Sequence, residues 1–352
     1  MKLSDKQQEV VNSNYSTTVC LSAPSSGKTL VLTERTKKLL NEGIDPKQIV
    51  LITFTNAAAE EMRKRIGEKA KDSYIGTIHG FANYILLYNG INTYQYIQDG
   101  KFDELFEAVK KVSYIPHFEH LLLDEAQDTS SIQWDFILNF INPTNLFVVA
   151  DYRQELYGWR GSDTETLRNL QYRKDSKVFH LNENYRNGQN ILNYAAGYML
   201  NNKLGYSYRD DSICCSGREG IVIKQRLDYD YIAEQIKKYD SFGDWFILTR
   251  TNEQLENFYF ELEKRGIPCV SFKQADLNNA ELTKVMNSNK VKVLTVHSSK
   301  GLENKNVMVY GCRVYNKDEI LVSYVAATRA KDRLYWLSAP AKKIKTNIIN
   351  WE

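Results

Sequence analysis

The stretch Ser22-Ala23-Pro24-Ser25-Ser26-Gly27-Lys28-Thr29 constrains this chain more than any other part of it. It follows the β-branched run 17–21 and precedes an apolar pattern that starts at Leu30, so we predict a strand, a tight loop and a helix start. Backbone N–H groups of such a loop converge on an anion, and the helix dipole adds partial positive charge. Lys28 would reach the outer phosphates of a nucleotide, and the Thr29 hydroxyl would bind Mg²⁺. The sequence therefore predicts a nucleoside triphosphate site.

The match to the phosphate-binding pattern is incomplete at its beginning. The octet fits the pattern from Gly27 onward, but Ser22 stands at the first position, which is normally glycine. On these residues alone, an ordinary strand-to-helix turn that contains a chance Gly-Lys-Thr stays open.

Length and composition restrict the class of protein. A chain of 352 residues has room for two domains. It has no apolar run long enough for a membrane span, and its N-terminus has no apolar signal core, so we expect a cytoplasmic protein without a membrane partner. The five cysteines are odd in number and scattered, as is typical of reduced thiols. A net charge of +3 is too small to predict nucleic-acid binding by itself.

Short apolar runs alternate with helical patterns along the chain. This alternation predicts an α/β fold of mainly parallel sheets with helices on both faces. A domain boundary is expected near Val178 to Leu181. The predicted strands are 49–53, 121–124, 147–150, 178–181, 221–223, 246–249, 291–296, 307–310 and 334–337, and the predicted helices include 57–69, 255–264 and 323–331.

The run 121–123 is an apolar strand that ends in Asp124 and Glu125. In an open α/β sheet such a strand delivers its acids to the carboxyl edge, beside a phosphate loop on a neighbouring strand. Asp124 would hold Mg²⁺, and Glu125 would polarise the water that attacks the γ-phosphate. The alternative is a solvated helix N-cap, because Asp and Glu are favoured at helix starts. The nearby predicted phosphate loop favours the catalytic interpretation.

Another apolar strand, 147–150, ends at Asp151 and runs into a loop with Tyr157, Trp159 and Arg160. Aromatic rings and an arginine on one loop would stack on bases and clamp a phosphate of single-stranded nucleic acid. Aromatic side chains are also common core residues, so packing stays open as an alternative here.

Taken in order, these motifs resemble the UvrD/Rep/PcrA-like branch of the superfamily 1 helicases over nearly the whole chain. In the first half, Leu3-Ser4-Asp5-Lys6-Gln7 is similar to the family's Q motif, Asp124-Glu125-Ala126-Gln127-Asp128 resembles its DExxD box, and Gln154 matches its γ-phosphate sensor. The resemblance implies that Gln7 contacts the adenine base. It also implies a group of DNA contacts, namely Phe54, Thr55, Asn56, Thr77, His79, Tyr157, Trp159 and Arg160.

The second half continues the series. Asn184-Tyr185-Arg186 resembles a motif whose Tyr stacks on adenine and whose Arg contacts the γ-phosphate, and 324–330 resembles motif VI with Arg329 as an arginine finger. The run 295–303 resembles motif V, which implies Glu303 near the ribose. Further DNA contacts implied by the resemblance are Arg250, Asn252 and His297.

The resemblance implies two RecA-like domains, 1–178 and 179–352, with ATP and Mg²⁺ in the cleft between them. The implied activity is an ATP-dependent 3′–5′ DNA helicase that acts on single strands and single-strand/duplex junctions. A translocase that strips proteins or drives a partner, and a nucleotide-dependent binding module with weak hydrolysis, stay open as alternatives. The implied catalytic residues are Lys28, Asp124, Glu125, Gln154, Arg186 and Arg329, the nucleotide contacts are Gln7, Ser25, Ser26, Gly27, Lys28, Thr29, Tyr185, Arg186, Glu303 and Arg329, and the Mg²⁺ ligands are Thr29 and Asp124.

The chain also departs from the family. Ser25 replaces a glycine, Leu30 stands where an arginine is common, and Tyr152-Arg153 replaces an acidic pair. About forty residues separate His79 from Asp124, where relatives insert an accessory domain, and the second insertion also looks absent. The apolar spacing of Phe102, Leu105, Phe106, Val109 and Val112 predicts one amphipathic helix in the first interval. We therefore expect a compact motor that unwinds long duplexes poorly as a free monomer and improves with a protein partner, with self-association or with applied tension at the fork.

Overall fold

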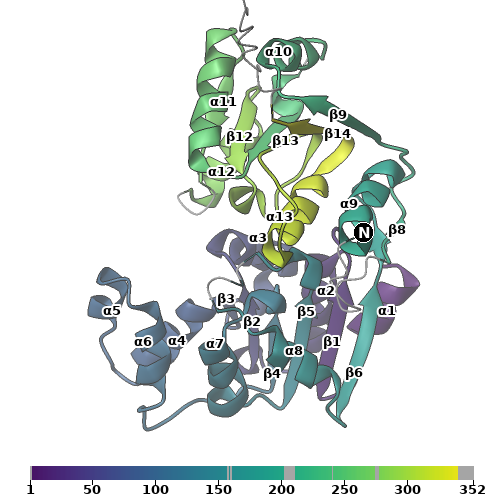
Figure 1. The fold of residues 1–352 in the computed structure, drawn as a ribbon. Coiled ribbons are helices and arrows are strands. Elements are labelled where there is room, and N and C mark those ends of the chain that lie inside the picture. The colour runs from purple at the N-terminus through teal and green to yellow at the C-terminus, as the bar shows by residue number, and fades with distance from the viewer. Residues whose placement is uncertain are drawn as a thin grey trace, which may run out of the picture. The chain divides into compact units, whose positions relative to one another are not determined.

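The computed structural model describes residues 2–156, 158, 161–201, 211–239, 241–273 and 277–339, with the side chains of 198–201 left aside. The chain divides into two compact units (Figure 1). Unit 1 comprises Met1–Arg186 and Met199–Ser216, and unit 2 comprises Asn187–Tyr198 and Gly217–Glu352.

Unit 1 is built on a six-stranded sheet in the order β3-β2-β4-β5-β1-β6, in which every neighbouring pair is parallel. Because the strands are parallel, all of their carboxyl ends lie at one edge. The strands are β1 Thr17–Ser22, β2 Ile49–Thr53, β3 Tyr74–Thr77, β4 His120–Leu123, β5 Asn145–Ala150 and β6 Ser176–Leu181. The α-helices are α1 Asp5–Val11, α2 Lys28–Asn41, α3 Asn56–Ile66, α4 Ile78–Tyr88, α5 Tyr94–Gln98, α6 Phe102–Val109, α7 Ser131–Asp135 and α8 Thr164–Gln171.

One layer of the unit 1 core lies between the sheet and helices α1, α2 and α3. Val31 and Leu32 of α2 are fully buried there, together with Leu51 of β2 and Leu122 of β4. Burying a side chain of this size contributes about 1.5–3 kcal/mol relative to leaving it exposed. This packing fixes α2 against the sheet. It therefore also fixes the phosphate loop that precedes α2.

The sheet order corrects one expectation. The strand that ends in Asp124 was expected beside the strand that leads into the phosphate loop, but β5 lies between β4 and β1 and pairs with both. The inserted strand is the one that ends at Asp151. The edge therefore presents the phosphate loop, the Asp151 turn and the acidic pair side by side, in that order.

The predicted amphipathic helix between His79 and Asp124 is present as α6, but it ends at Val109, so Val112 lies outside it and is only partly buried. Its Leu105, Phe106 and Val109 are buried, and Phe102 is exposed. The Phe106 ring lies 5.2 Å from that of Phe136 and 5.2 Å from that of His79, so α6 packs on unit 1 and does not form a core of its own.

Unit 2 contains a second six-stranded parallel sheet, in the order β11-β12-β10-β13-β14-β9. Trp245, Val293 and Met308 are fully buried in its core. The strands are β9 Ile221–Arg226, β10 Trp245–Thr249, β11 Cys269–Ser271, β12 Val291–Thr295, β13 Asn304–Tyr310 and β14 Ala330–Ser338. The α-helices are α9 Gln189–Asn201, α10 Tyr229–Lys237, α11 Asn252–Lys264, α12 Asn279–Met286 and α13 Lys317–Ala327. Two parallel α/β sheets of this kind are consistent with two RecA-like domains. In the described part of the chain, no helix combines the length and the apolarity of a membrane span.

Two predicted boundaries differ from the structure. The division expected between residues 178 and 179 falls inside β6, which pairs with β1 along its length, and unit 1 continues to Arg186. The segment 199–216 also returns to unit 1, where β8 Ile213–Cys214 pairs with β7 Glu183–Asn184. The helix predicted over 323–331 ends at Ala327, because Ala330 already pairs with β13 as the first residue of β14.

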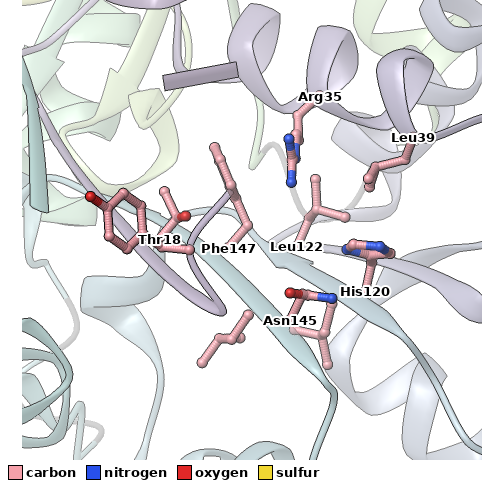
Figure 2. Close-up of a pocket in the computed structure, with 10 residues that line it drawn as sticks. Thr18, Arg35, Leu39, His120, Leu122, Asn145 and Phe147 are labelled. Carbon is pink, nitrogen blue, oxygen red and sulfur yellow. The ribbon is translucent and has the colours of Figure 1, made fainter. Parts of the chain in front are cut away.

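A small cavity lies in unit 1 at the amino ends of β1, β4 and β5 (Figure 2). Its volume of about 10 Å³ is enough for about one water molecule. Arg35, His120 and Asn145 line it together with apolar side chains. Arg35 Nη1 also donates to the Val11 carbonyl at the end of α1 over 2.9 Å, so this arginine ties α2 to α1. The cavity lies at the edge of the sheet opposite the phosphate loop.

Candidate nucleotide and DNA sites

The phosphate loop follows β1 and ends at Gly27, the N-cap of α2, with φ of 86°. A Cβ atom on Gly27 would lie 2.5 Å from Gln7 Nε2, so glycine fits here for both its φ and its size. Ser25 also has a positive φ, 54°. The first N–H groups of α2 lack intrahelical acceptors and, with the helix dipole, form an anion-binding end.

The serine at the first position of the loop has a structural role. Ser22 Oγ donates to the Ala150 carbonyl over 2.9 Å and so joins the ends of β1 and β5. Ser26 is also buried, and its Oγ has no hydrogen-bond partner among the described residues. A buried hydroxyl without a partner is costly, and a bound phosphate oxygen would accept from it.

Lys28 and Thr29 are the first two residues of α2, and both are partly exposed. Within the described residues, neither the Lys28 ammonium nor the Thr29 hydroxyl has a hydrogen-bond or ion-pair partner. A cation and a hydroxyl at a helix N-terminus with no protein partner suit a phosphate and a hydrated metal ion.

The acidic pair follows β4 directly. Asp124 is buried and accepts a hydrogen bond from the Glu125 N–H over 2.9 Å. Glu125 has φ of 50°, a left-handed conformation that is uncommon for a side chain of this size and is concentrated at functional sites. Its Oε2 accepts a hydrogen bond from Gln127 Nε2. The turn therefore holds the two carboxylates in different environments.

Gln154 lies at the end of β5, between the phosphate loop and the acidic pair. Its Nε2 donates to Asp151 Oδ2 over 2.8 Å. Asp151 Oδ1 accepts from Arg153 Nε over 2.8 Å, and Arg153 Nη2 donates to the Ser22 carbonyl over 3.0 Å. These three side chains are buried and connect the end of β5 to the end of β1.

Tyr185 and Arg186 belong to unit 1 and are tied to the phosphate loop. The Tyr185 N–H donates to the Ser25 carbonyl over 3.3 Å. Asn184, which is fully buried, donates from Nδ2 to the Pro24 carbonyl over 2.8 Å and accepts from the Arg186 N–H over 3.0 Å. Tyr185 is 42% exposed.

Gln7 is buried beside the same loop. Its Nε2 donates to the Ser26 carbonyl over 2.9 Å, and its Oε1 accepts from the Ser4 N–H over 3.0 Å as half of a capping box. Because a carboxamide has two N–H groups and two lone pairs on oxygen, one donor and one acceptor remain for a base. Tyr185 and Ser4 both donate to Glu183 Oε2, and these bonds lower the pKa of that carboxyl.

These residues fit a nucleotide with Mg²⁺. The edge of the sheet offers the ammonium of Lys28, the hydroxyl of Thr29, the buried carboxylate of Asp124 and the N-terminus of α2. Among the described residues there is no group of three or more His, Cys, Asp or Glu side chains that could hold a metal by themselves. Mg²⁺ is commonly held by one or two protein oxygens together with substrate phosphates, which is the donor set that Thr29 and Asp124 provide.

In unit 2, the two residues expected to act on the nucleotide are engaged within their own unit. Glu303 forms an ion pair with Lys331 at 2.7 Å. Arg329 is buried and donates from Nε to the Val325 carbonyl over 3.0 Å and from Nη1 to the Leu302 carbonyl over 3.3 Å. Their predicted roles as ribose contact and arginine finger stay predictions.

Several residues predicted to contact DNA have local structural roles. The hydroxyl of Thr55 accepts from the Ala58 N–H and that of Thr77 from the Gly80 N–H, so they are the N-caps of α3 and α4. Phe54, directly before Thr55, is 42% exposed and offers a ring for stacking. Asn56, the first residue of α3, is partly exposed.

His79 packs against the rings of Phe102 and Phe106. Burial lowers its pKa, an effect that Asp103 partly opposes. A contact from His79 to DNA would therefore come from a neutral ring near pH 7.

In unit 2, Arg250 forms a two-pronged ion pair with Glu319 of α13, with Nη2 at 2.7 Å and Nε at 2.9 Å from Oε1. This pair raises the pKa of the arginine. Asn252 begins α11, and His297 begins a 3₁₀ turn after β12. The predicted contacts Tyr157, Trp159 and Arg160 lie outside the described residues. None of these DNA contacts is tested by the geometry, and they stay predictions.

Four residues that were not predicted as site residues also hold the nucleotide site together: Ser22, Gln127, Arg153 and Asn184. All are buried and hydrogen-bonded to the motifs described above. The sequence did contain an indication of their role, because each of the four residues lies within or directly beside a motif. A buried role could not be distinguished from a solvated one before the strands were placed.

Together, the phosphate loop and the two parallel α/β sheets are typical of P-loop proteins with RecA-like architecture. Two family models match the chain: the UvrD/REP helicase N-terminal domain over residues 3–108 and 91–175, and the UvrD-like helicase C-terminal domain over residues 179–277 and 271–340. The chain belongs to the UvrD/PcrA-like superfamily 1 helicases.

Individual relatives agree with this family. The chain is 24% identical to a probable DNA helicase of Mycoplasma pneumoniae, in an alignment that covers 96% of this chain and 83% of that protein. It is 26% identical to the ATP-dependent DNA helicase PcrA of Leuconostoc citreum over 76% of this chain, and 27% identical to DNA helicase II of Haemophilus influenzae over 72%. The matched part spans about half the length of each of these last two proteins, 49% in both cases.

Proposed function

We propose that this chain hydrolyses ATP with Mg²⁺ to move 3′ to 5′ along single-stranded DNA and to separate duplex at single-strand/duplex junctions. The observation that carries the proposal is the arrangement at one edge of the unit 1 sheet. There Lys28 and Thr29, which have no side-chain partner in the described part of the chain, begin α2, the Asp124–Glu125 turn follows β4, and Gln154 lies at the end of the strand between them. Membership of a family of ATP-dependent DNA helicases agrees with this arrangement.

Each residue has a chemical role in the proposed hydrolysis. The α2 N-terminus and Lys28 hold the β- and γ-phosphates, Thr29 and Asp124 hold the metal, and Glu125 accepts a proton from the attacking water. When bound, Mg²⁺ neutralises charge that develops on the phosphates. Gln154 orients the γ-phosphate and the water. Tyr185 stacks on adenine, and Gln7 reads its edge with the donor and acceptor that its contacts leave over.

We further propose that the remaining predicted residues complete the cycle. Arg186 contacts the γ-phosphate, Glu303 lies near the ribose, and Arg329 stabilises the transition state. An arginine in this role increases turnover by about 10³–10⁵-fold. Hydrolysis would then depend on closure of the two units around the nucleotide, which moves one DNA-gripping surface relative to the other. We expect the protein to act on DNA in the cytoplasm.

A second candidate function is a translocase that strips proteins from DNA or drives a partner. It is favoured by the short interval between His79 and Asp124, in which α5 and α6 are the only α-helices after α4 and in which α6 packs on unit 1. A helix or two cannot form an independent domain of the usual size. A partner protein would then supply the contacts to duplex DNA.

The test is a steady-state ATPase measurement with and without single-stranded DNA, followed by unwinding of tailed duplexes of both polarities. The proposal expects stimulation by DNA and opening from a 3′ tail. Streptavidin displacement without duplex opening would favour the stripping translocase. ATPase activity that is not stimulated by DNA would contradict both functions.

A further inference from the structure

Arg153 occupies an unusual position at the nucleotide edge of unit 1. Its side chain is 7% exposed, and that of Asp151, with which it forms an ion pair, is 1% exposed. The Arg153 backbone N–H and Nε both donate to Asp151 Oδ1, over 3.1 and 2.8 Å. Its Nη2 donates in another direction, to the carbonyl of Ser22 in the phosphate loop over 3.0 Å. One guanidinium therefore joins the loop to the turn after β5.

The same carboxylate holds Gln154. Asp151 Oδ2 accepts from Gln154 Nε2 over 2.8 Å, while Oδ1 is held by Arg153. A carboxylate fixed at one oxygen by a guanidinium has little freedom to rotate, so the amide bound to its other oxygen is fixed as well. Arg153 and Asp151 thus connect the amide of Gln154 to the phosphate loop.

The network also continues toward the acidic pair. The Asp151 N–H donates to Gln127 Oε1 over 2.9 Å, and Gln127 Nε2 donates to Glu125 Oε2. Gln127 is fully buried. The chain of bonds therefore runs from the loop carbonyl at Ser22 to the residue proposed to activate water, and Arg153 is its link to the loop.

We propose that Arg153 is a positioning residue for ATP hydrolysis: it holds Asp151, and through Asp151 the amide of Gln154, at a fixed place relative to the phosphate loop. This inference rests on the proposed function. It concerns a position at which this chain departs from the family, because a basic residue stands where an acidic one is usual. Arginine offers separate nitrogens in a planar fork to Asp151 and Ser22, whereas the compact ammonium of lysine lacks this fixed geometry.

The experiment is a double-mutant cycle between Arg153→Lys and Gln154→Ala, measured in the full chain as DNA-stimulated ATP turnover. If Arg153 acts through Gln154, Arg153→Lys lowers kcat by about tenfold or more and leaves the KM for ATP within about twofold. The double variant then loses little beyond the Gln154→Ala variant, because the two residues act as one unit. Losses in kcat that multiply in the double variant would overturn the proposal.

Folding is controlled separately. Arg153→Ala would leave Asp151 buried without its partner and is expected to fold poorly, so Arg153→Lys is the informative change. Arg173→Lys, at an exposed arginine after α8, is the matched control and should leave kcat unchanged. A fall in thermal stability for Arg153→Lys with an unchanged kcat would show a structural role only and would also overturn the proposal.

Failure of the proposed function gives a different result. If Lys28→Ala keeps full ATP turnover, the nucleotide site itself is wrong, whatever the cycle shows. If Lys28→Ala is inactive and the cycle is multiplicative, the proposed function stands and the role of Arg153 alone is rejected.

Discussion

The side-chain amide of Asn184 donates to the carbonyl oxygen of Pro24 over 2.8 Å, although the two residues are 160 positions apart in the sequence. The bond joins the phosphate loop to the segment that carries Tyr185 and Arg186. The Oδ1 atom of Asn184 accepts a hydrogen bond from the Arg186 N–H. One buried amide therefore holds both the phosphate loop and the segment that carries Tyr185 and Arg186. The proposed phosphate contact and the proposed adenine contact thus share one anchor.

Asn184→Asp should weaken ATP binding. The change keeps the shape of the side chain but removes the donor, so the Pro24 carbonyl is left without this bond at a buried site, at a cost of about 1–3 kcal/mol. We expect a severalfold higher KM for ATP and a lower unfolding temperature. Steady-state kinetics and thermal unfolding measure the two effects. Asn193→Asp, at an exposed position of α9, is the control. An unchanged KM would mean that the anchor does not act on the nucleotide.

Lys28→Ala and Glu125→Gln should both abolish ATP turnover, for different reasons. Lys28 supplies charge to bound phosphates, whereas Glu125 acts only on the attacking water. The Glu125→Gln protein should therefore still bind ATP, and the Lys28→Ala protein should bind it weakly. Binding is measured with a fluorescent ATP analogue. An equal loss of binding in both variants would contradict these roles.

The local elements were largely predictable from the sequence, but their pairing was not. The apolar run Leu121–Leu123 predicts β4 because a strand buried on both faces reads as continuous apolar residues. The short strand β3 was not predicted, because its four residues include Gly76, and glycine is disfavoured in strands. The insertion of β5 between β1 and β4, and the contact of Arg153 with Ser22, depend on residues far apart in the chain, which local patterns do not encode.

His79 predicts a pH dependence of stability. Burial against Phe102 and Phe106 lowers its pKa in the folded protein below the ordinary value of 6.5. The unfolded chain then binds a proton at higher pH than the folded chain, so the free energy of unfolding falls as the pH drops below about 6.5. The loss is about 1.4 kcal/mol for each unit by which the pKa is lowered.

His79→Gln should remove part of this pH dependence, which denaturant titrations between pH 7.5 and 5 can measure. His120 contributes in the same direction, because burial lowers its pKa too. His180→Gln, at an exposed position, is the control. An identical pH profile for the wild-type and His79→Gln proteins would contradict the buried, neutral state of His79.

The ion pair between Arg250 and Glu319 predicts a measurable change in DNA binding. If Arg250 contacts a DNA phosphate, Glu319 competes for its guanidinium, so Glu319→Gln should tighten binding to single-stranded DNA. Arg250→Ala should weaken it and reduce the salt slope of the affinity by about 0.7, the contribution of one phosphate contact to a single strand. Fluorescence anisotropy over a salt series measures both. A salt slope unchanged by Arg250→Ala would remove Arg250 from the DNA path.

The last prediction concerns duplex unwinding by the free chain. Between His79 and Asp124, unit 1 holds the short helices α5 and α6 after α4, and the buried face of α6 is used to pack on unit 1. Opening a base-pair step costs about 1.4 kcal/mol on average, and a motor without a domain that holds the duplex has little means to trap a frayed end. We therefore expect 3′ to 5′ translocation on single strands together with poor unwinding of long duplexes by monomers. Single-turnover unwinding of short and long tailed duplexes, at limiting protein concentration, measures this difference. Processive opening of the long duplex by monomers, or opening only from a 5′ tail, would contradict the prediction.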